Sequence, residues 1–438
     1  MPVVCCSCIT KELLIHSEKY KSSIFFPVLT SGGGMGLFMK KLKIFIIVGF
    51  CFILFSSLAI SLFSSDREFS DMENRELAQK PVFSGKSFLD GRYQDSYGEW
   101  LNDQFFWRDG WSFAAANLQA AFGKKDINGV YLGKNGCLLE KYQETDFEQE
   151  QVNENTGYLS KFLNYSVKHY GKDHVHCMML PSKAGALPDS LPVFAGPFDT
   201  GKVLKGLKDS LDEPDVLLDA GEILKKHQEE YIYYRTDHHW TTLGAYYAWT
   251  QFAEVADLPV RGLEHYQRET VFTGFYGTTY NKVHIRVAPD SVELFHNPGE
   301  KGIQVDMDDG ELVAGSVYFP EEAEKGFNKY NIFFSKNTFK IVVTTEAGTG
   351  KSLLLVKDSF ANCFVPFLTE DYDQIIMVDY RYGKVPVKDI MEQYKDITDV
   401  FVMFNTEKFM QNTKLSRLAD TGKGETGMKK FNLEDFLE

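Results

Sequence analysis

The sequence predicts an α/β domain, a parallel sheet flanked by helices, preceded by one transmembrane helix. Three observations support this prediction. A charge-free apolar run occupies residues 44–63, short apolar runs such as 175–180 and 352–356 each end in polar residues, and segments with helical spacing separate those runs. With 438 residues, 44% of them hydrophobic, the chain can bury a large core in one large domain or two smaller ones.

The apolar run at residues 44–63 is long enough to cross a bilayer as a helix. Three lysines at positions 40, 41 and 43 precede it, which predicts that everything after residue 65 lies outside the cell. A cleaved signal peptide is the alternative. Because no Ala-x-Ala site follows the run, we favour an uncleaved anchor at residues 39–65.

The first 38 residues do not resemble the rest of the chain. Residues 31–34 read Ser-Gly-Gly-Gly, as a ribosome-binding site translated in frame would, and Met39-Lys40-Lys41 is a natural start for a membrane anchor. We therefore expect residues 1–38 to be non-native, with translation beginning at Met39 or Met35. Cys5, Cys6 and Cys8 in this stretch are accordingly not counted as a metal or lipid site.

Charge and cysteine content exclude some partners. A formal net charge of −14 argues against a nucleic-acid partner, whereas a neutral polysaccharide or a small acyl donor would not be repelled. Beyond residue 65 only Cys137, Cys177 and Cys363 remain, and they form no CxxC pair. We expect neither a disulfide framework nor a zinc site, and no cofactor.

After the anchor, the polar residues 66–90 predict a stalk, residues 91–410 the main domain, and residues 411–438 a polar tail. Asp103 and Arg108 lie in the first helical region and are expected to form an internal ion pair or a helix cap rather than to act in catalysis. In chain order, the domain is predicted to contain a helical region at 91–122, a strand–turn–strand unit at 127–139, a helix at 146–170, strands at 175–180 and 215–218, helices at 220–231 and 243–256, a β-rich insertion at about 265–340, a strand at 352–356, a helix to 368, and strands at 375–378 and 400–404 with a helix between them.

Ser359 has the setting of a serine nucleophile. It follows the apolar strand 352–356 and precedes a helical segment. A sharp strand-to-helix turn exposes the hydroxyl, and the helix N-terminus offers N–H groups to a developing oxyanion. A serine after a buried strand is also common without any catalytic role. Ser359 therefore needs a base and an orienting acid elsewhere in the chain.

Asp237-His238-His239-Trp240 supplies such a pair. Asp-x-His places an acid and a base on one short loop before the helix that Thr241 or Thr242 can cap. One alternative is a helix-entry loop in which Asp237 caps and the histidines pack. Another is a metal site, since Asp and His are good ligands. No third and fourth ligand occurs at a spacing typical of a metal site.

These two blocks, Asp237–Trp240 and Val356-Lys357-Asp358-Ser359-Phe360, resemble those of the DHHW protein family. That family is similar to SGNH-hydrolase-like acetyltransferases that modify alginate and other exported polysaccharides. The resemblance extends over most of residues 70–410 and implies an SGNH-hydrolase-like fold. It also implies that Asp237 is the acid, His239 the base and Ser359 the nucleophile. The chain departs from the pattern at Lys357, where the related enzymes have glycine.

No Gly-x-Asn-Asp block that would supply an oxyanion asparagine is recognisable. The candidates for oxyanion or substrate contacts are Asn281, Gly277, Lys183, His238 and Arg381.

The function implied is extracytoplasmic O-acetyl transfer to a cell-surface or exported polysaccharide, with a membrane-bound O-acyltransferase as the acyl donor partner. An acetyl esterase with the same triad is one alternative. A non-catalytic polysaccharide-binding or assembly protein on the same scaffold is another.

Overall fold

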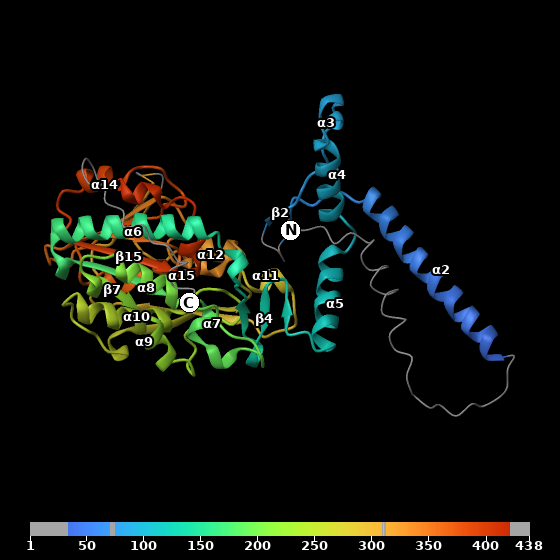
Figure 1. The fold of residues 1–438 in the computed structure, drawn as a ribbon, viewed down its shortest axis with the longest axis horizontal. Coiled ribbons are helices and arrows are strands. Elements are labelled where there is room, and N and C mark those ends of the chain that lie inside the picture. Colours follow the sequence, from blue (N-terminus) through green and yellow to red (C-terminus); the bar gives the residue numbers. More distant parts are fainter. Residues whose placement is uncertain (1–33, 71–74, 309, 311, 421–438) are drawn as a thin grey trace. The chain divides into compact units, whose positions relative to one another are not determined.

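A computed structural model describes residues 34–70, 75–308, 310 and 312–420 (Figure 1). The expectations for the first 33 residues, including the three cysteines near the N-terminus, lie outside the described residues. Contacts divide the chain into two units, Met1–Ser65 and Asp66–Glu438, which are described separately here.

In the first unit, the described residues form one long helix, α2 (Gly34–Phe63). Its segment Phe38–Ser61, 24 residues with a mean hydropathy of 2.6, is the one stretch of the described residues that is long and apolar enough to span a membrane. Apolar side chains such as Phe45 and Phe52 are exposed along it. A helix of this kind fits either a retained anchor or a signal sequence.

The second unit is built on an eight-stranded sheet of order β11-β10-β12-β14-β13-β15-β6-β7. The five strands β14, β13, β15, β6 and β7 are parallel neighbours. The remaining three are added through antiparallel pairings. The predicted α/β fold with a parallel sheet is confirmed. The sheet has more strands than predicted, because β10 and β11 from the β-rich region and β12 at its end are added to one edge. The strands described in the second unit are β1 (Phe69–Ser70), β2 (Arg75–Glu76), β3 (Asp126–Ile127), β4 (Val130–Leu132), β5 (Leu138–Glu140), β6 (Val175–Leu180), β7 (Leu217–Asp219), β8 (Gln267–Phe275), β9 (Asp290–His296), β10 (Gln304–Met307), β11 (Leu312–Ala314), β12 (Lys340–Thr344), β13 (Ser352–Lys357), β14 (Gln374–Val378) and β15 (Asp399–Asn405).

Helices cover both faces of this sheet (Figure 1). Because side chains alternate between the two faces, every residue of the central strands is buried. In β13, Leu353 and Leu355 pack with α10 and α13, whereas Leu354 and Val356 pack on the opposite face with α6, α8 and α14. The helices of the second unit are α3 (Gly85–Leu89), α4 (Arg92–Asp103), α5 (Arg108–Ala121), α6 (Gln149–Tyr170), α7 (Lys183–Ala186), α8 (Gly201–Asp209), α9 (Gly221–Lys226), α10 (Thr242–Val255), α11 (Tyr280–Val283), α12 (Pro320–Lys325), α13 (Phe360–Phe364), α14 (Val387–Gln393) and α15 (Thr406–Met410).

Two segments expected to be polar appendages make specific contacts. In residues 66–90, expected as a stalk, Asp66 accepts a hydrogen bond from the indole of Trp100, and Arg75 forms an ion pair with Asp103. At the other end, the 3-10 helix η9 (Leu415–Ala419) lies in the range expected as a tail. It packs on α6 with Leu415 buried.

The topology brings the polar ends of several strands to one edge of the sheet. Strands β13, β15 and β6 are adjacent and parallel, and their carboxyl ends lead into Ser359, Asn405 and Ser182. In open α/β sheets this edge is where ligands bind. The site described below lies there.

Candidate active site

The Asp237–Trp240 block sits in a tight hairpin loop that enters α10. Tyr233 and Trp240 pair across the loop, and the amide of Tyr234 donates to the carbonyl of His239 at 3.2 Å. The hydroxyl of Thr241 then caps α10 by accepting from the amide of Gly244. Both ends of the loop are thereby fixed, so the side chains between them have defined directions.

A second carboxylate, Asp290, holds the loop from outside. It accepts hydrogen bonds from the amide of Arg235 at 2.8 Å, the amide of Thr236 at 2.7 Å and the hydroxyl of Thr236 at 2.5 Å. The hydroxyl of Tyr231 also donates to it. Asp290 is fully buried at the start of β9. Nothing in the sequence near residue 290 identified it, because its partners lie more than 50 residues earlier in the chain.

Asp237 is fully buried and accepts four hydrogen bonds. Its Oδ1 accepts from the amide of His239 at 2.9 Å and from Nδ1 of the same residue at 2.6 Å. Its Oδ2 accepts from the amide of Thr278 at 2.8 Å and from its hydroxyl at 2.9 Å. Although burial acts in the opposite direction, the neighbouring imidazoles and these hydrogen bonds hold the pKa of Asp237 well below its usual range. The group is therefore an ionised acceptor.

His239 bridges this carboxylate and the candidate nucleophile. Because Nδ1 donates to Asp237, Nε2 is left as the acceptor, and it lies 2.8 Å from the hydroxyl oxygen of Ser359. The three residues are all buried, with Ser359 7% exposed. The structure thus places Ser359, His239 and Asp237 in the hydrogen-bonded sequence that activates a serine for acyl transfer.

Two aromatic residues lock the base against the nucleophile. The ring of Tyr330 stacks on His239 with centroids 3.8 Å apart, and its hydroxyl donates to the carbonyl of Ser359 at 3.0 Å. Trp240 is fully buried, and its indole N–H donates to the carbonyl of Phe360 at 3.1 Å. The tryptophan of the motif is therefore structural, because it fastens the histidine loop to the turn that carries Ser359.

The strand that presents Ser359 ends in charged residues rather than glycine. Lys357 is buried, donates to Oδ1 of Asn362 at 2.6 Å and lies 3.9 Å from Asp379. Burial lowers the pKa of Lys357 to about 8. Asp358 accepts from the amides of Phe360 at 2.9 Å and Asn405 at 2.7 Å. The buried side chain of Lys357 thus stabilises the turn that carries Ser359 through its contact with Asn362. The related pattern has glycine at this position.

Two family models match this part of the chain. The DHHW protein model matches residues 218–378, which include Asp237, His239 and Ser359. The model of the SGNH hydrolase-like domain of the acetyltransferase AlgX matches residues 130–283. The predicted resemblance to the DHHW protein family is confirmed. None of the curated proteins compared with the chain matches it.

Solved structures support the same fold. A DHHW family protein from Eubacterium siraeum is 23% identical, with a TM-score of 0.52 over 68% of this chain and 98% of that protein. PatB1 of Bacillus cereus with a sulfonyl adduct is 17% identical, with a TM-score of 0.52 over 68% of this chain and 99% of its own. Both share the fold of about two thirds of this chain.

Not all of the five candidates for oxyanion or substrate contacts lie in the pocket beside the triad. The amide of Gly277 donates to the hydroxyl of Thr236 at 3.1 Å, and a Cβ at this position would come within 2.2 Å of Asp237. Gly277 is therefore a glycine because the chain passes directly against Asp237. Arg381 forms a two-pronged ion pair with Asp379, outside the pocket at the triad.

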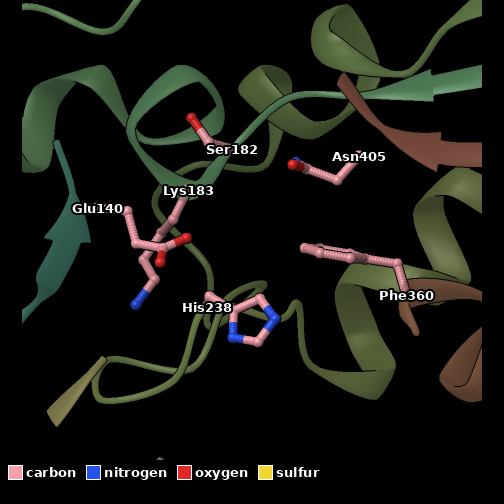
Figure 2. Close-up of a pocket in the computed structure, with 6 residues that line it drawn as sticks. All are labelled: Glu140, Ser182, Lys183, His238, Phe360 and Asn405. Atoms are coloured by element: carbon pink, nitrogen blue, oxygen red, sulfur yellow. The ribbon is translucent and has the colours of Figure 1, made fainter. Parts of the chain in front are cut away.

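Lys183 and His238 do line a small pocket next to the triad (Figure 2). The ammonium group of Lys183 donates to the carbonyls of Leu138 at 2.6 Å and Arg235 at 3.2 Å, so it braces the histidine loop. The pocket also contains Asn405, which the sequence analysis missed. Asn405 ends β15, the neighbour of the strand that presents Ser359, and the pattern of an apolar strand followed by a polar residue would have identified it.

A larger, open groove lies on the other side of Thr278. It is lined by residues 274–278, 280–281 and 324–329, and includes the candidate Asn281. The rings of Tyr276 and Tyr280 pack at a tilt in it with centroids 4.4 Å apart, and Tyr276 is 38% exposed. Thr278 connects the groove to the triad because it contacts Asp237 and His238 as well.

Asp237, His238 and His239 are also close enough together to hold a metal ion, with ligand atoms within 4.8 Å of one another. Binding there would require His239 to give up its hydrogen bond with Asp237, and Asp237 to give up some of the four that it accepts. The donor set as arranged is complete without a metal. It fits proton transfer better than coordination.

Proposed function

We propose that this chain is an extracytoplasmic O-acetyltransferase that acts on a cell-surface or exported polysaccharide. The observation that carries the proposal is the hydrogen-bonded sequence Ser359–His239–Asp237, at 2.8 Å and 2.6 Å. It is supported by the match to an SGNH hydrolase-like acetyltransferase domain.

In the first half of the reaction, Nε2 of His239 takes the proton of Ser359 as its Oγ attacks the carbonyl of an acetyl donor. Asp237 holds the imidazole in the required tautomer and stabilises the imidazolium that forms. The donor's leaving group departs with that proton, and the acetyl group remains on Ser359. In the second half, a sugar hydroxyl gives its proton to His239 and attacks the acetyl carbonyl. His239 then returns this proton to Oγ of Ser359 as the bond between the acetyl group and Ser359 breaks.

The tetrahedral intermediates need a hydrogen-bond donor for their oxyanion. We assign Asn405 to this position in place of Asn281, Gly277 and Arg381. Its side chain is oriented by donation from the amide of Lys408 at 3.0 Å to its Oδ1 and by its own donation to the carbonyl of Leu180 at 3.3 Å. The side-chain amide has two N–H groups, so one remains for the oxyanion in the pocket beside Phe360.

The open groove is the place for the acceptor chain. The exposed ring of Tyr276 offers a flat apolar surface to the C–H face of a sugar, and Thr278 leads from the groove to the triad. We place the acetyl donor at a membrane-bound O-acyltransferase. An anchor formed by α2 keeps the soluble domain next to such a partner, with the domain outside the cell.

The test is covalent capture of the acetyl group. The full chain in detergent is incubated with 4-nitrophenyl acetate, and acetylation is mapped by mass spectrometry. Acetyl-Ser359 that is absent from Ser359→Ala and lost from His239→Ala supports the proposal. No acetylation with this ester or with an acetylated polysaccharide would point instead to a non-catalytic polysaccharide-binding protein. Turnover to free acetate, with no product on any acceptor alcohol, would make the chain an esterase.

A further inference from the structure

Six residues from five parts of the chain line the small pocket beside the triad: Glu140, Ser182, Lys183, His238, Phe360 and Asn405. In Figure 2, Glu140 and Lys183 lie to the left of the pocket, Asn405 and Phe360 to its right, Ser182 above and His238 below. His238 and Phe360 directly neighbour the catalytic candidates in sequence. The ring of His238 lies 3.8 Å from that of His239. A group bound in the pocket is therefore adjacent to the reacting atoms.

Hydrogen bonding fixes the tautomer of His238. The hydroxyl of Thr278 donates its single hydrogen to the ionised carboxylate of Asp237 at 2.9 Å. The same hydroxyl oxygen lies 2.5 Å from Nδ1 of His238, so Nδ1 must carry the proton and donate it. Burial, followed by the proximity of His239, lowers the pKa of His238 to about 3, which keeps the ring neutral. Nε2 is consequently a bare acceptor.

No partner for this Nε2 lies within hydrogen-bond distance in the described part of the chain, and 19% of the side chain is exposed. Ser182 also lines the pocket, and its hydroxyl has no hydrogen-bond partner in the described part of the chain, but Figure 2 shows its oxygen turned away from His238. Nε2 of His238 is therefore the group that a ligand in the pocket can pair. An accessible acceptor of this kind favours a ligand that donates a hydrogen bond.

The chemistry of the pocket limits what that ligand can be. The carboxylate of Glu140 repels an anion, and the neutral His238 does not attract one. A cation is disfavoured because Glu140 already accepts from Lys282 at 2.5 Å and lies 3.8 Å from Lys408. An apolar group would cover Nε2 of His238 without a hydrogen bond. A neutral hydroxyl donates a hydrogen bond to this nitrogen without bringing a charge into the pocket.

We propose that this pocket binds a second hydroxyl group of the acceptor sugar, beside the hydroxyl that is acetylated, with Nε2 of His238 as its hydrogen-bond acceptor. The inference rests on the proposed function and deepens it, because it makes the acceptor a vicinal diol. A diol held there by one hydroxyl keeps its neighbouring hydroxyl at the acetyl-serine, whereas a water molecule in the pocket holds no second nucleophile in place. The pocket therefore favours transfer to a sugar over hydrolysis.

The test compares acceptors on the full chain in detergent, with 4-nitrophenyl acetate as donor. The acceptors are cyclohexanol and the cis and trans isomers of cyclohexane-1,2-diol, and the readout is alcohol acetate formed per acetate released. The diol has two equivalent hydroxyls, which alone gives a twofold advantage. We expect one of the diols to exceed cyclohexanol by about tenfold beyond that factor, the fold-change of about one hydrogen bond to an unpaired buried group.

Two substitutions separate the nitrogens of His238. His238→Asn keeps a donor at the position of Nδ1 and removes the acceptor at Nε2. His238→Gln places an oxygen at the position of Nε2 and removes the donor to Thr278. We expect the diol preference to disappear in the Asn variant and to persist in the Gln variant, whatever the change in total turnover.

Equal use of diol and cyclohexanol by the unaltered chain would overturn the inference without any variant. So would a diol preference that survives His238→Asn. In either case, ester turnover and acetyl-Ser359 would still stand, and with them the proposed function. Absence of acetyl-Ser359 in the unaltered chain overturns both.

Discussion

Replacing Asp237 by asparagine tests whether its carboxylate sets the tautomer of His239. The carboxylate accepts from two donors on His239 and two on Thr278, at 2.6 to 2.9 Å. An amide has one oxygen and one NH₂ group, so it can satisfy only one of these two sides. If the oxygen faces His239, the NH₂ group meets the amide N–H of Thr278. If it faces Thr278, the NH₂ group meets both N–H groups of His239.

The second orientation moves the proton of His239 from Nδ1 to Nε2. A protonated Nε2 can no longer accept the proton of Ser359. We expect turnover of 4-nitrophenyl acetate to fall about 10⁴-fold, or about 5 kcal/mol, which is typical when the acid of a triad becomes an amide. Each orientation also leaves one buried backbone N–H against another donor. The free energy of unfolding should therefore fall by about 1–3 kcal/mol.

Asp290→Asn is the matched control. Asp290 also accepts from four donors on and beside the same loop, including Tyr231 and Thr236, but it does not touch His239. It should lose a similar free energy of unfolding, measured by urea denaturation, and less than about tenfold in turnover if folding stays intact. A fall of less than about tenfold in folded Asp237→Asn, or an equal fall in both variants, would refute the orienting role of Asp237.

Three further predictions concern the pocket, the groove and a buried acid. Asn405→Ala should lower ester turnover by about 10²–10³-fold through loss of an oxyanion donor, and unchanged kinetics would remove it from that role. Tyr276→Ala should reduce acetylation of a soluble polysaccharide by about tenfold relative to that of cyclohexanediol; an equal effect on both acceptors would argue against the groove. Burial raises the pKa of Glu407 from 4.5 to about 7, so the folded chain keeps a proton that the unfolded chain releases between these values. Stability should therefore fall as pH rises through that window, by about 3 kcal/mol at most, and Glu407→Gln should lack this fall in thermal melts at pH 5 and pH 8; equal slopes would contradict it.

Much of the fold was predictable because burial on both faces of a parallel sheet produces continuous apolar runs. The predicted strands at 175–180, 352–356 and 400–404 correspond to β6, β13 and β15, within a residue or two at their ends. Other elements depended on long-range pairing. The β-rich region was predicted as an insertion, yet its strands β10 and β11 extend the main sheet through β12, since an edge strand looks the same in sequence whichever sheet it joins.

Sequence by itself determined the Asp237-His238-His239-Trp240 block, the setting of Ser359 after a buried strand, and one apolar segment fit to span a membrane. These features are local, because each depends on residues that are neighbours in the chain. The tertiary structure alone decided that Tyr330 stacks on His239, that Asn405 enters the pocket, and that His238 keeps a bare nitrogen. Some of those contacts join residues more than 160 positions apart in the chain. The directions of hydrogen bonds between such residues are defined only after the strands have paired and brought their side chains together.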